Sequence, residues 1–280
     1  VMRKIRVKIN PHRELRAGYM FSLDMITWSH RSEEGNKYSM VLKCNACHVY
    51  EILNLYLKSD AVNAFEEWLV DTRANPLFAD LPYPMCFMLK TDNDGAWSED
   101  NKEWQAMIKR NHVNMYYVAP DRHAEANGFA EKACGIIEVV TKSFLAQRSL
   151  PPSWWQRAAS DVMFLANRFP PYEIEANTPV DQDCPSPIER LFRNYISRHQ
   201  VYRELDSYII VGTPALCRKG GVKGSSLEPR VRWGISMGQR GKVTKWLCPF
   251  TNARFRTRQY TAFKLRSGMN YSQFLGLGDN

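Results

Sequence analysis

The sequence lacks several features that would place it in common protein classes. No apolar run approaches the roughly 20 residues that a membrane-spanning helix needs. There is no internal repeat and no low-complexity segment, which argues against a solenoid or a disordered array. The seven cysteines are an odd number, and no secretory leader precedes them. We therefore expect an intracellular protein with reduced thiols, no disulfides and no membrane partner.

Two short motifs are incomplete. Residues 44–48 have the CxxCH spacing of a c-type haem attachment and of half a zinc site, but no second CxxC follows. Residues 220–226 combine glycines, a lysine and hydroxyls, but without the spacing of a phosphate-binding loop. We expect ordinary turn residues in the first motif and a flexible loop in the second.

Acidic residues are almost absent from the two ends of the chain. Residues 218–266 contain 13 Lys or Arg and only Glu228, and residues 1–17 contain six against Glu14. Residues 18–217 have the opposite balance, with 19 basic and 26 acidic side chains. An acidic body between basic flanks suits a protein whose body concentrates metal ions and whose flanks bind a polyanion.

With 280 residues, 44% of them hydrophobic, the chain can form one large core and a smaller domain. Apolar runs predict strands at residues 19–28, 37–43, 49–57, 85–89 and 113–118. Helical patterns follow Asp60, surround Trp104 and begin again at Asn127. The last of these helices has Ala130, Ala133, Ile137, Val140 and Phe144 on one predicted core face.

Three carboxylates occupy unusual positions in this pattern. Asp24 lies within an apolar strand, where an ionised side chain is costly unless it is paired or binds a metal. Asp92 follows an apolar run at a strand end, and Glu131 falls in the first turn of the helix from Asn127. Hard cations such as Mg²⁺ prefer oxygen ligands, so these three form a candidate metal site.

These residues resemble the catalytic core of retroviral and retrotransposon integrases, and within that group the copia-type elements. The similarity rests on Asp24, on residues 91–95 (TDNDG), and on Pro120 leading to residues 127–131 (NGFAE). It continues through Trp154-Trp155 and residues 166–170 (ANRFP) to residues 228–235 (EPRVRWGI), so it covers most of the chain.

The resemblance implies a ribonuclease-H-like α/β fold: a mixed five-stranded sheet with flanking helices, followed by a small C-terminal β-barrel. It implies that Asp24, Asp92 and Glu131 are catalytic and bind Mg²⁺ or Mn²⁺ for two-metal phosphoryl transfer. The expected reactions are 3′-end processing of element DNA and strand transfer into target DNA. The expected partners are both DNAs and further copies of the chain, in the nucleus or in a cytoplasmic particle.

The chain also departs from the family pattern. Between Asp92 and Glu131 lie 38 residues, a longer interval than the family usually has. We assign the extra residues to loops, which tolerate insertion. Glu125 therefore competes with Glu131, although it precedes the Asn127-Gly128 pair. The family's N-terminal zinc module is missing, so we expect a fragment of a longer polyprotein.

Short apolar segments separated by basic turns predict the barrel, at residues 208–211, 231–235, 243–247 and 255–263. Its aromatic residues are expected in its core. Six basic residues are the predicted DNA contacts: Lys132, Lys242, Lys245, Arg254, Arg256 and Arg258. The predicted domains are a basic linker (1–17), the core (18–170), a linker with a short helix (171–204), the barrel (205–268) and a tail (269–280).

Two other functions remain open at this point. One is a catalytically inactive nucleic-acid-binding module derived from a mobile element. The other is a ribonuclease or exonuclease of the same fold, which would need a fourth clustered acid, and Asp94 or Glu125 supplies it only weakly.

Overall fold

The structure is a computed structural model that describes residues 16–79, 81, 83–92, 95–118, 127–169, 184–192, 195–218, 231–240, 243–248, 251, 253–257 and 260–262. The chain forms two compact units whose segments alternate along the sequence. The first unit contains residues 1–27, 38–134 and 166–198, and the second contains residues 28–37, 135–165 and 199–280. The domain boundaries at 170 and 204 stay predictions.

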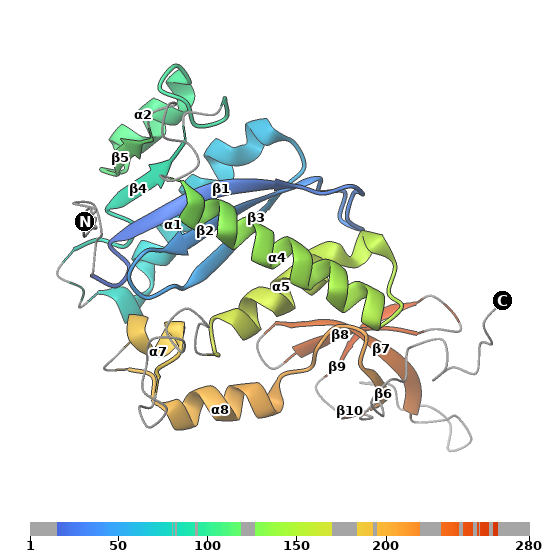
Figure 1. The fold of residues 1–280 in the computed structure, drawn as a ribbon. Coiled ribbons are helices and arrows are strands. Elements are labelled where there is room, and N and C mark those ends of the chain that lie inside the picture. Colours follow the sequence, from blue (N-terminus) through green and yellow to red (C-terminus); the bar gives the residue numbers. More distant parts are fainter. Residues whose placement is uncertain are drawn as a thin grey trace, which may run out of the picture. The chain divides into compact units, whose positions relative to one another are not determined.

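The first unit is built on a mixed five-stranded sheet, as the sequence predicted (Figure 1). The strand order is β3-β2-β1-β4-β5. The neighbours β1, β2 and β3 are antiparallel, whereas β4 and β5 run parallel to β1. The strands are β1 (Met20–Thr27), β2 (Tyr38–Cys44), β3 (Tyr50–Leu55), β4 (Met88–Thr91) and β5 (Asn114–Tyr117).

The helices that flank this sheet start where the sequence supplies a cap or an apolar face. Asn101 accepts a hydrogen bond from the Trp104 amide and so caps α2, a contact worth about 1 kcal/mol. The first unit contains α1 (Ala61–Ala74), α2 (Lys102–Arg110) and α7 (Pro187–Leu191), with short 3₁₀ turns η1 (Lys58–Asp60) and η2 (Pro76–Phe78). Helix α1 buries Phe65 and Leu69 completely in the apolar core.

The two faces of the sheet differ in character, and this difference positions the candidate site. Phe21 and Leu23 of β1 point into the apolar core that α1 and α2 cover. Because side chains alternate along a strand, Ser22 and Asp24 lie on the opposite face. Lys43 of β2 is buried on that face too, with its ammonium 4.3 Å from the Phe129 ring centroid. This second face, where Ser22 and Lys43 are buried beside the apolar Met20 and Ile26, is called the polar face.

Helix α4 (Gly128–Gln147) contributes residues to both units. Ala130, Ala133 and Ile137 are buried, as predicted, but Val140 is 43% exposed and that prediction is wrong. The buried stripe continues by four-residue steps through Thr141 and Leu145, so Val140 falls outside it. Among the described residues, no helix is both long and apolar enough to cross a membrane.

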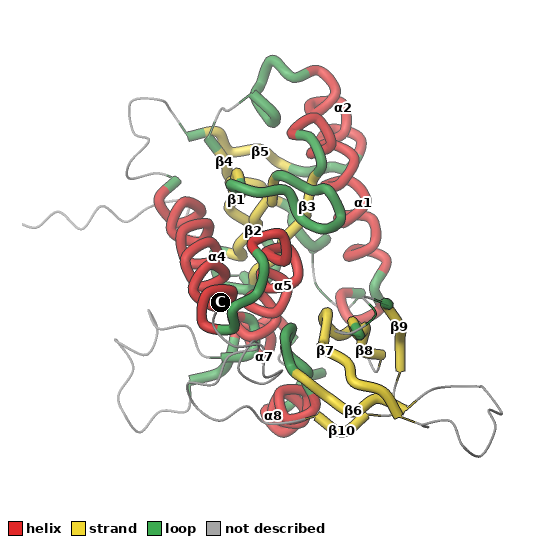
Figure 2. Tube along the Cα trace, turned by 90° about the vertical axis from the view of Figure 1, so that its right-hand side faces the viewer, coloured by secondary structure: helices red, strands yellow, loops and turns green. Residues whose placement is uncertain are grey.

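The second unit contains an antiparallel five-stranded sheet, whose strands carry the labels β6, β7, β8, β9 and β10 in Figure 2. Its order is β10-β6-β7-β8-β9. Its elements are η4 (Pro152–Trp154), α5 (Trp155–Ala166), α8 (Arg198–Ser207), β6 (Pro214–Arg218), β7 (Val231–Arg240), β8 (Val243–Leu247), β9 (Arg254–Thr257) and β10 (Tyr260–Ala262). Ala215, Cys217 and Trp246 form its buried centre.

Three details differ from the sequence prediction. Residues 208–211 form no strand. The Asp161 carboxylate accepts hydrogen bonds from the Tyr208 hydroxyl and from the Val211 amide, and in a strand that amide would bond to a neighbouring strand. The helix predicted at 188–196 is shorter, at Pro187–Leu191. Most of α8 lies in the predicted linker. In the described residues β9 and β10 are not paired with each other, so closure into a barrel stays a prediction.

Candidate active site and nucleic-acid interface

Asp24 lies on the central strand β1, half-buried on the polar face of the first sheet. The Met25 amide donates a hydrogen bond to its Oδ1 at 2.7 Å. Burial raises the pKa of this carboxyl above its ordinary value, and the negative charges of Asp92 and Glu131 raise it further, against opposing contacts from Met25 and the Cys134 thiol. The Asp24 carboxylate is thus close enough to the other two for their charges to act on it.

Asp92 follows directly after β4, the strand parallel to β1. Ser22 and Lys90 are paired in the register of these strands, and Asp24 and Asp92 each come two residues later. Neighbouring parallel strands keep such residues level and on one face, so Asp24 inside β1 lies level with Asp92 just past the end of β4. The Asp92 Oδ1 accepts hydrogen bonds from the Trp97 indole at 2.9 Å and the Thr91 hydroxyl at 3.3 Å.

Glu131 lies exposed in the first turn of α4. Its amide bonds to the Asn127 carbonyl, which starts the helix. The Asn127 side chain is 2% exposed, and neither of its polar atoms has a hydrogen-bond partner among the described residues. The helix start therefore places the Glu131 carboxylate where its charge acts on the half-buried one of Asp24.

The charges of Asp92 and Glu131 both act on Asp24, but the three carboxylates form no closed cage. Within the described residues, no three His, Cys, Asp or Glu side chains are close enough to hold one metal ion. The donor chemistry nevertheless fits a hard divalent cation, since all three groups offer oxygen and their mutual repulsion favours a positive charge between them. The competitors Glu125 and Asp94 lie outside the described residues.

Three of the predicted DNA contacts gather on the second sheet. Lys245 of β8 and Arg256 of β9 are cross-strand partners, and both are exposed. Arg254 is two residues from Arg256 and is also exposed, while Phe255 between them packs on the buried centre. Like charges placed opposite each other destabilise a sheet, so this face suits an anionic partner.

The remaining predicted contacts lie elsewhere. Lys132 is exposed on α4, next to Glu131. Lys242 and Arg258 lie outside the described residues.

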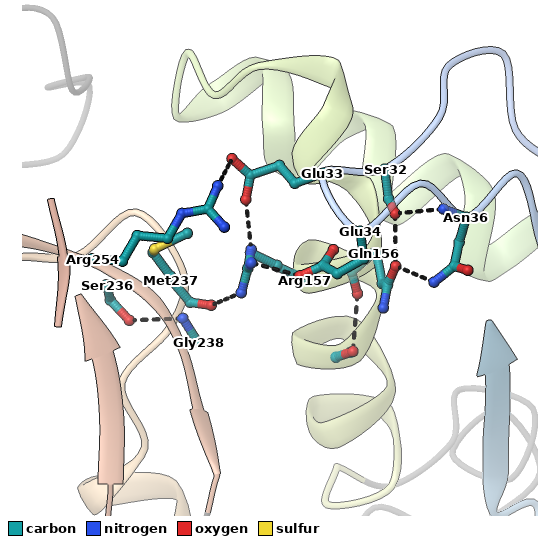
Figure 3. Close-up of polar contacts among 11 residues, drawn as sticks. Ser32, Glu33, Glu34, Asn36, Gln156, Arg157, Ser236, Met237, Gly238 and Arg254 are labelled. Atoms are coloured by element: carbon teal, nitrogen blue, oxygen red, sulfur yellow. Dashed lines mark hydrogen bonds and ion pairs between the residues drawn. The ribbon is translucent and has the colours of Figure 1, made fainter. Parts of the chain in front are cut away.

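An ion-pair cluster holds the Arg254 end of β9 (Figure 3). The Arg254 Nη2 lies 3.6 Å from the Glu33 carboxylate. Arg157 of α5 donates to Glu33 at 3.1 Å, to Glu34 at 2.6 Å and to the Met237 carbonyl at 2.9 Å. Arg157 is only 11% exposed at its side chain, so it anchors the cluster, whereas Arg254 is 62% exposed and its charge stays accessible to solvent.

Sequence reasoning missed Trp97, which contacts a predicted site residue directly. The only available signal was a large aromatic residue five positions after Asp92 within a polar stretch. Such a signal indicates burial but not the direction of an indole N–H.

No protein-family model matches the chain, and no curated protein matches it. Among solved structures, a chain of the simian T-cell lymphotropic virus intasome in complex with PP2A regulatory subunit B56 gamma is similar at 13% identity and TM-score 0.47, over 90% of this chain and 79% of that one. The magnesium complex of the HTLV-2 integrase catalytic core domain, in its trimeric form, gives 14% identity and TM-score 0.43, over 63% of this chain and 98% of that one. The dimeric form of the same core domain gives 15% identity and TM-score 0.39, over 55% of this chain and 88% of that one.

Proposed function

We propose that the chain is an integrase-like polynucleotidyl transferase that trims the 3′ ends of element DNA by hydrolysis and joins them to target DNA. The observation that carries this proposal is the register of β1 and β4, which levels Asp24 with Asp92. The charges of Asp92 and Glu131 also raise the pKa of Asp24, so two of the carboxylates that the resemblance implies as catalytic act on the third.

The fold supports the same function. The order β1-β2-β3-α1-β4-α2-β5-α4, with three antiparallel and two parallel strands, is the ribonuclease-H-like arrangement that the resemblance implies. In this arrangement Asp24 and Asp92 lie level on neighbouring strands, and Glu131 in the first turn of α4 supports the proposal because its charge acts on Asp24.

Each carboxylate has a separate part in the proposed chemistry. The charges of both other acids act on Asp24, so its carboxylate would be a ligand of both cations, while Asp92 and Glu131 would each be a ligand of one. Mg²⁺ or Mn²⁺ bound there would activate a water or a 3′-hydroxyl and stabilise the leaving oxygen of an in-line displacement. The exposed face of Lys245, Arg254 and Arg256 would hold the DNA backbone.

Further copies of the chain are part of this proposal, because two DNA ends must be joined to one target. A catalytically inactive nucleic-acid-binding module is the second candidate. It is favoured by the absence of a three-ligand metal group within the described ranges and by the long interval between Asp92 and Glu131.

Substitution of the three acids by their neutral isosteres tests the proposal. Asp24→Asn, Asp92→Asn and Glu131→Gln should each abolish strand transfer of labelled donor DNA in Mg²⁺ while the fold stays intact, because each removes one ligand charge and no bulk. Glu103→Gln is the matched control, since Glu103 is an exposed first-turn glutamate of α2.

Two outcomes would change the assignment. Activity that survives Glu131→Gln and is lost in Glu125→Gln would make Glu125 the third ligand. A wild-type protein that binds DNA but shows no metal-dependent cleavage or joining would favour the inactive module.

A further inference from the structure

Among the residues that the structure describes, hydrogen bonds hold the Asp92 carboxylate at one oxygen. Its Oδ1 accepts both the Trp97 indole N–H, at 2.9 Å, and the Thr91 hydroxyl, at 3.3 Å. Its Oδ2 makes no hydrogen bond within the described residues. The terminal torsion of an aspartate is broad, so a carboxylate without such contacts would rotate freely.

Trp97 is a rigid donor. Its side chain is 1% exposed and belongs to the apolar core of the first unit. Its ring packs near Trp104, with centroids 6.5 Å apart. An indole can donate a hydrogen bond but cannot accept one, and it carries no charge. The Trp97 N–H therefore fixes Oδ1 without neutralising the carboxylate and without competing for a cation.

We propose that Trp97 is a positioning residue for metal binding: its indole N–H orients the Asp92 carboxylate so that Oδ2 is presented to the divalent cation. This inference rests on the proposed function, because it takes Asp92 as a metal ligand. Side chains that orient ligands in this way typically change metal affinity or activity by about 10–100-fold when they are removed.

A purely structural role makes a different prediction. If the bond only satisfied a buried N–H, its loss would lower the stability of the fold and leave the metal affinity unchanged. Metal affinity measured apart from activity separates the two roles.

Trp97→Phe removes the N–H and keeps an aromatic ring. Titration calorimetry with Mg²⁺ and with Mn²⁺, on the full chain without DNA, should show dissociation constants raised about 10–100-fold relative to wild type. Trp155→Phe is the matched control: it removes a similarly buried indole N–H that donates to the His30 carbonyl and not to Asp92. Its dissociation constants should stay at the wild-type value.

A wild-type dissociation constant in Trp97→Phe, or an equal loss in both variants, would overturn the inference. If Trp97→Phe does not fold, the indole N–H resonances of the eight tryptophans can be followed in wild type and in Asp92→Asn. The chemical shift of one indole N–H resonance should differ between wild type and Asp92→Asn. The same resonance should move when Mg²⁺ is added to wild type. No resonance responding to Asp92→Asn would overturn the inference.

The inference and the proposed function fail in distinguishable ways. If wild type binds metal and Asp92→Asn abolishes strand transfer while Trp97→Phe behaves as wild type, only the role of Trp97 is wrong. If wild type binds no divalent metal, both are wrong.

Discussion

At the residue scale, the informative feature is a carboxylate in a strand that the hydrophobic pattern would otherwise fill with an apolar residue. Asp24 is half-buried, and its pKa is raised by burial first and by two neighbouring acids next. The same causes favour cation binding. A cation would take the place of the lost water around the Asp24 carboxylate and would reduce its repulsion from the two neighbouring acids.

The metal dependence of stability follows from this position. We expect Mg²⁺ at about 100 times its dissociation constant to stabilise wild type by about 2.7 kcal/mol, a rise of several degrees in the melting temperature. The folded-state pKa of Asp24 is raised, so without metal the folded chain holds this proton more tightly than the unfolded chain does. Proton binding at Asp24 therefore adds to the free energy of unfolding at low pH, and this addition is lost as the pH rises through the raised pKa. The cation displaces the proton, so the Mg²⁺-induced shift should grow over the same interval.

Thermal melts with and without Mg²⁺ across this pH range check the expectation. Asp24→Asn should show neither the shift nor its pH dependence. A shift of equal size at every pH would show that Asp24 is not involved.

At the element scale, a buried carboxylate determines the path of the segment before β6. Asp161 of α5 is 1% exposed; its Oδ1 accepts the Tyr208 hydroxyl and its Oδ2 accepts the Val211 amide, both at 2.6 Å. Arg148 donates to the Val211 carbonyl at 3.1 Å. These contacts replace the strand that the apolar residues 208–211 predicted.

Asp161→Ala should destabilise the fold by about 1–3 kcal/mol, because it leaves the Val211 amide without its acceptor. Burial raises the pKa of Asp161 to about 6, against opposing contacts from Tyr208, Val211 and Arg148. The folded state therefore holds this proton more tightly than the unfolded chain, and the stability from Asp161 increases as the pH falls from above about 6 to about 4. Urea unfolding of wild type and of Asp161→Ala at the two ends of this pH range should show the larger difference in free energy of unfolding at the lower pH. A larger difference at the higher pH would contradict this assignment.

At the scale of the whole molecule, the segregation of charge along the sequence becomes a basic face on the second sheet. Lys245 and Arg256 lie opposite each other, and Arg254 lies beside them. Phosphate contacts of this kind bind DNA without reading its sequence.

The triple substitution of Arg254, Arg256 and Arg258 by alanine should weaken binding about equally for all DNA sequences. It should also flatten the dependence of log affinity on log salt by up to roughly 0.9 per lost phosphate contact. Fluorescence anisotropy at several salt concentrations measures both effects. Alanine at Lys58, Lys102 and Lys109, three exposed lysines of the first unit, is the control with the same loss of charge.

An unchanged salt slope in the arginine variant would assign these arginines to the sheet or to a protein partner. Residual activity of the same variant at low salt should exceed that of Asp92→Asn, because the three acids are untouched.

The sequence by itself determined the order of elements in the first unit and the charge of the flanks. These depend on local pattern: period-two and period-3.6 hydrophobicity, and the near absence of acids after residue 217. The mixed arrangement of the first sheet was instead implied by the resemblance to a known family. The sequence also singled out Asp24, since a charge inside an apolar strand is visible without any structure.

Only the tertiary structure decided how side chains distant in sequence meet. Val140 lies outside the buried stripe of α4, Asp161 takes the amide that would have made a strand at residues 208–211, and Trp97 donates to Asp92. Each outcome depends on where a side chain from another segment points, and no local pattern encodes that direction. The register of β1 with β4, which levels Asp24 with Asp92, is a property of the folded sheet for the same reason.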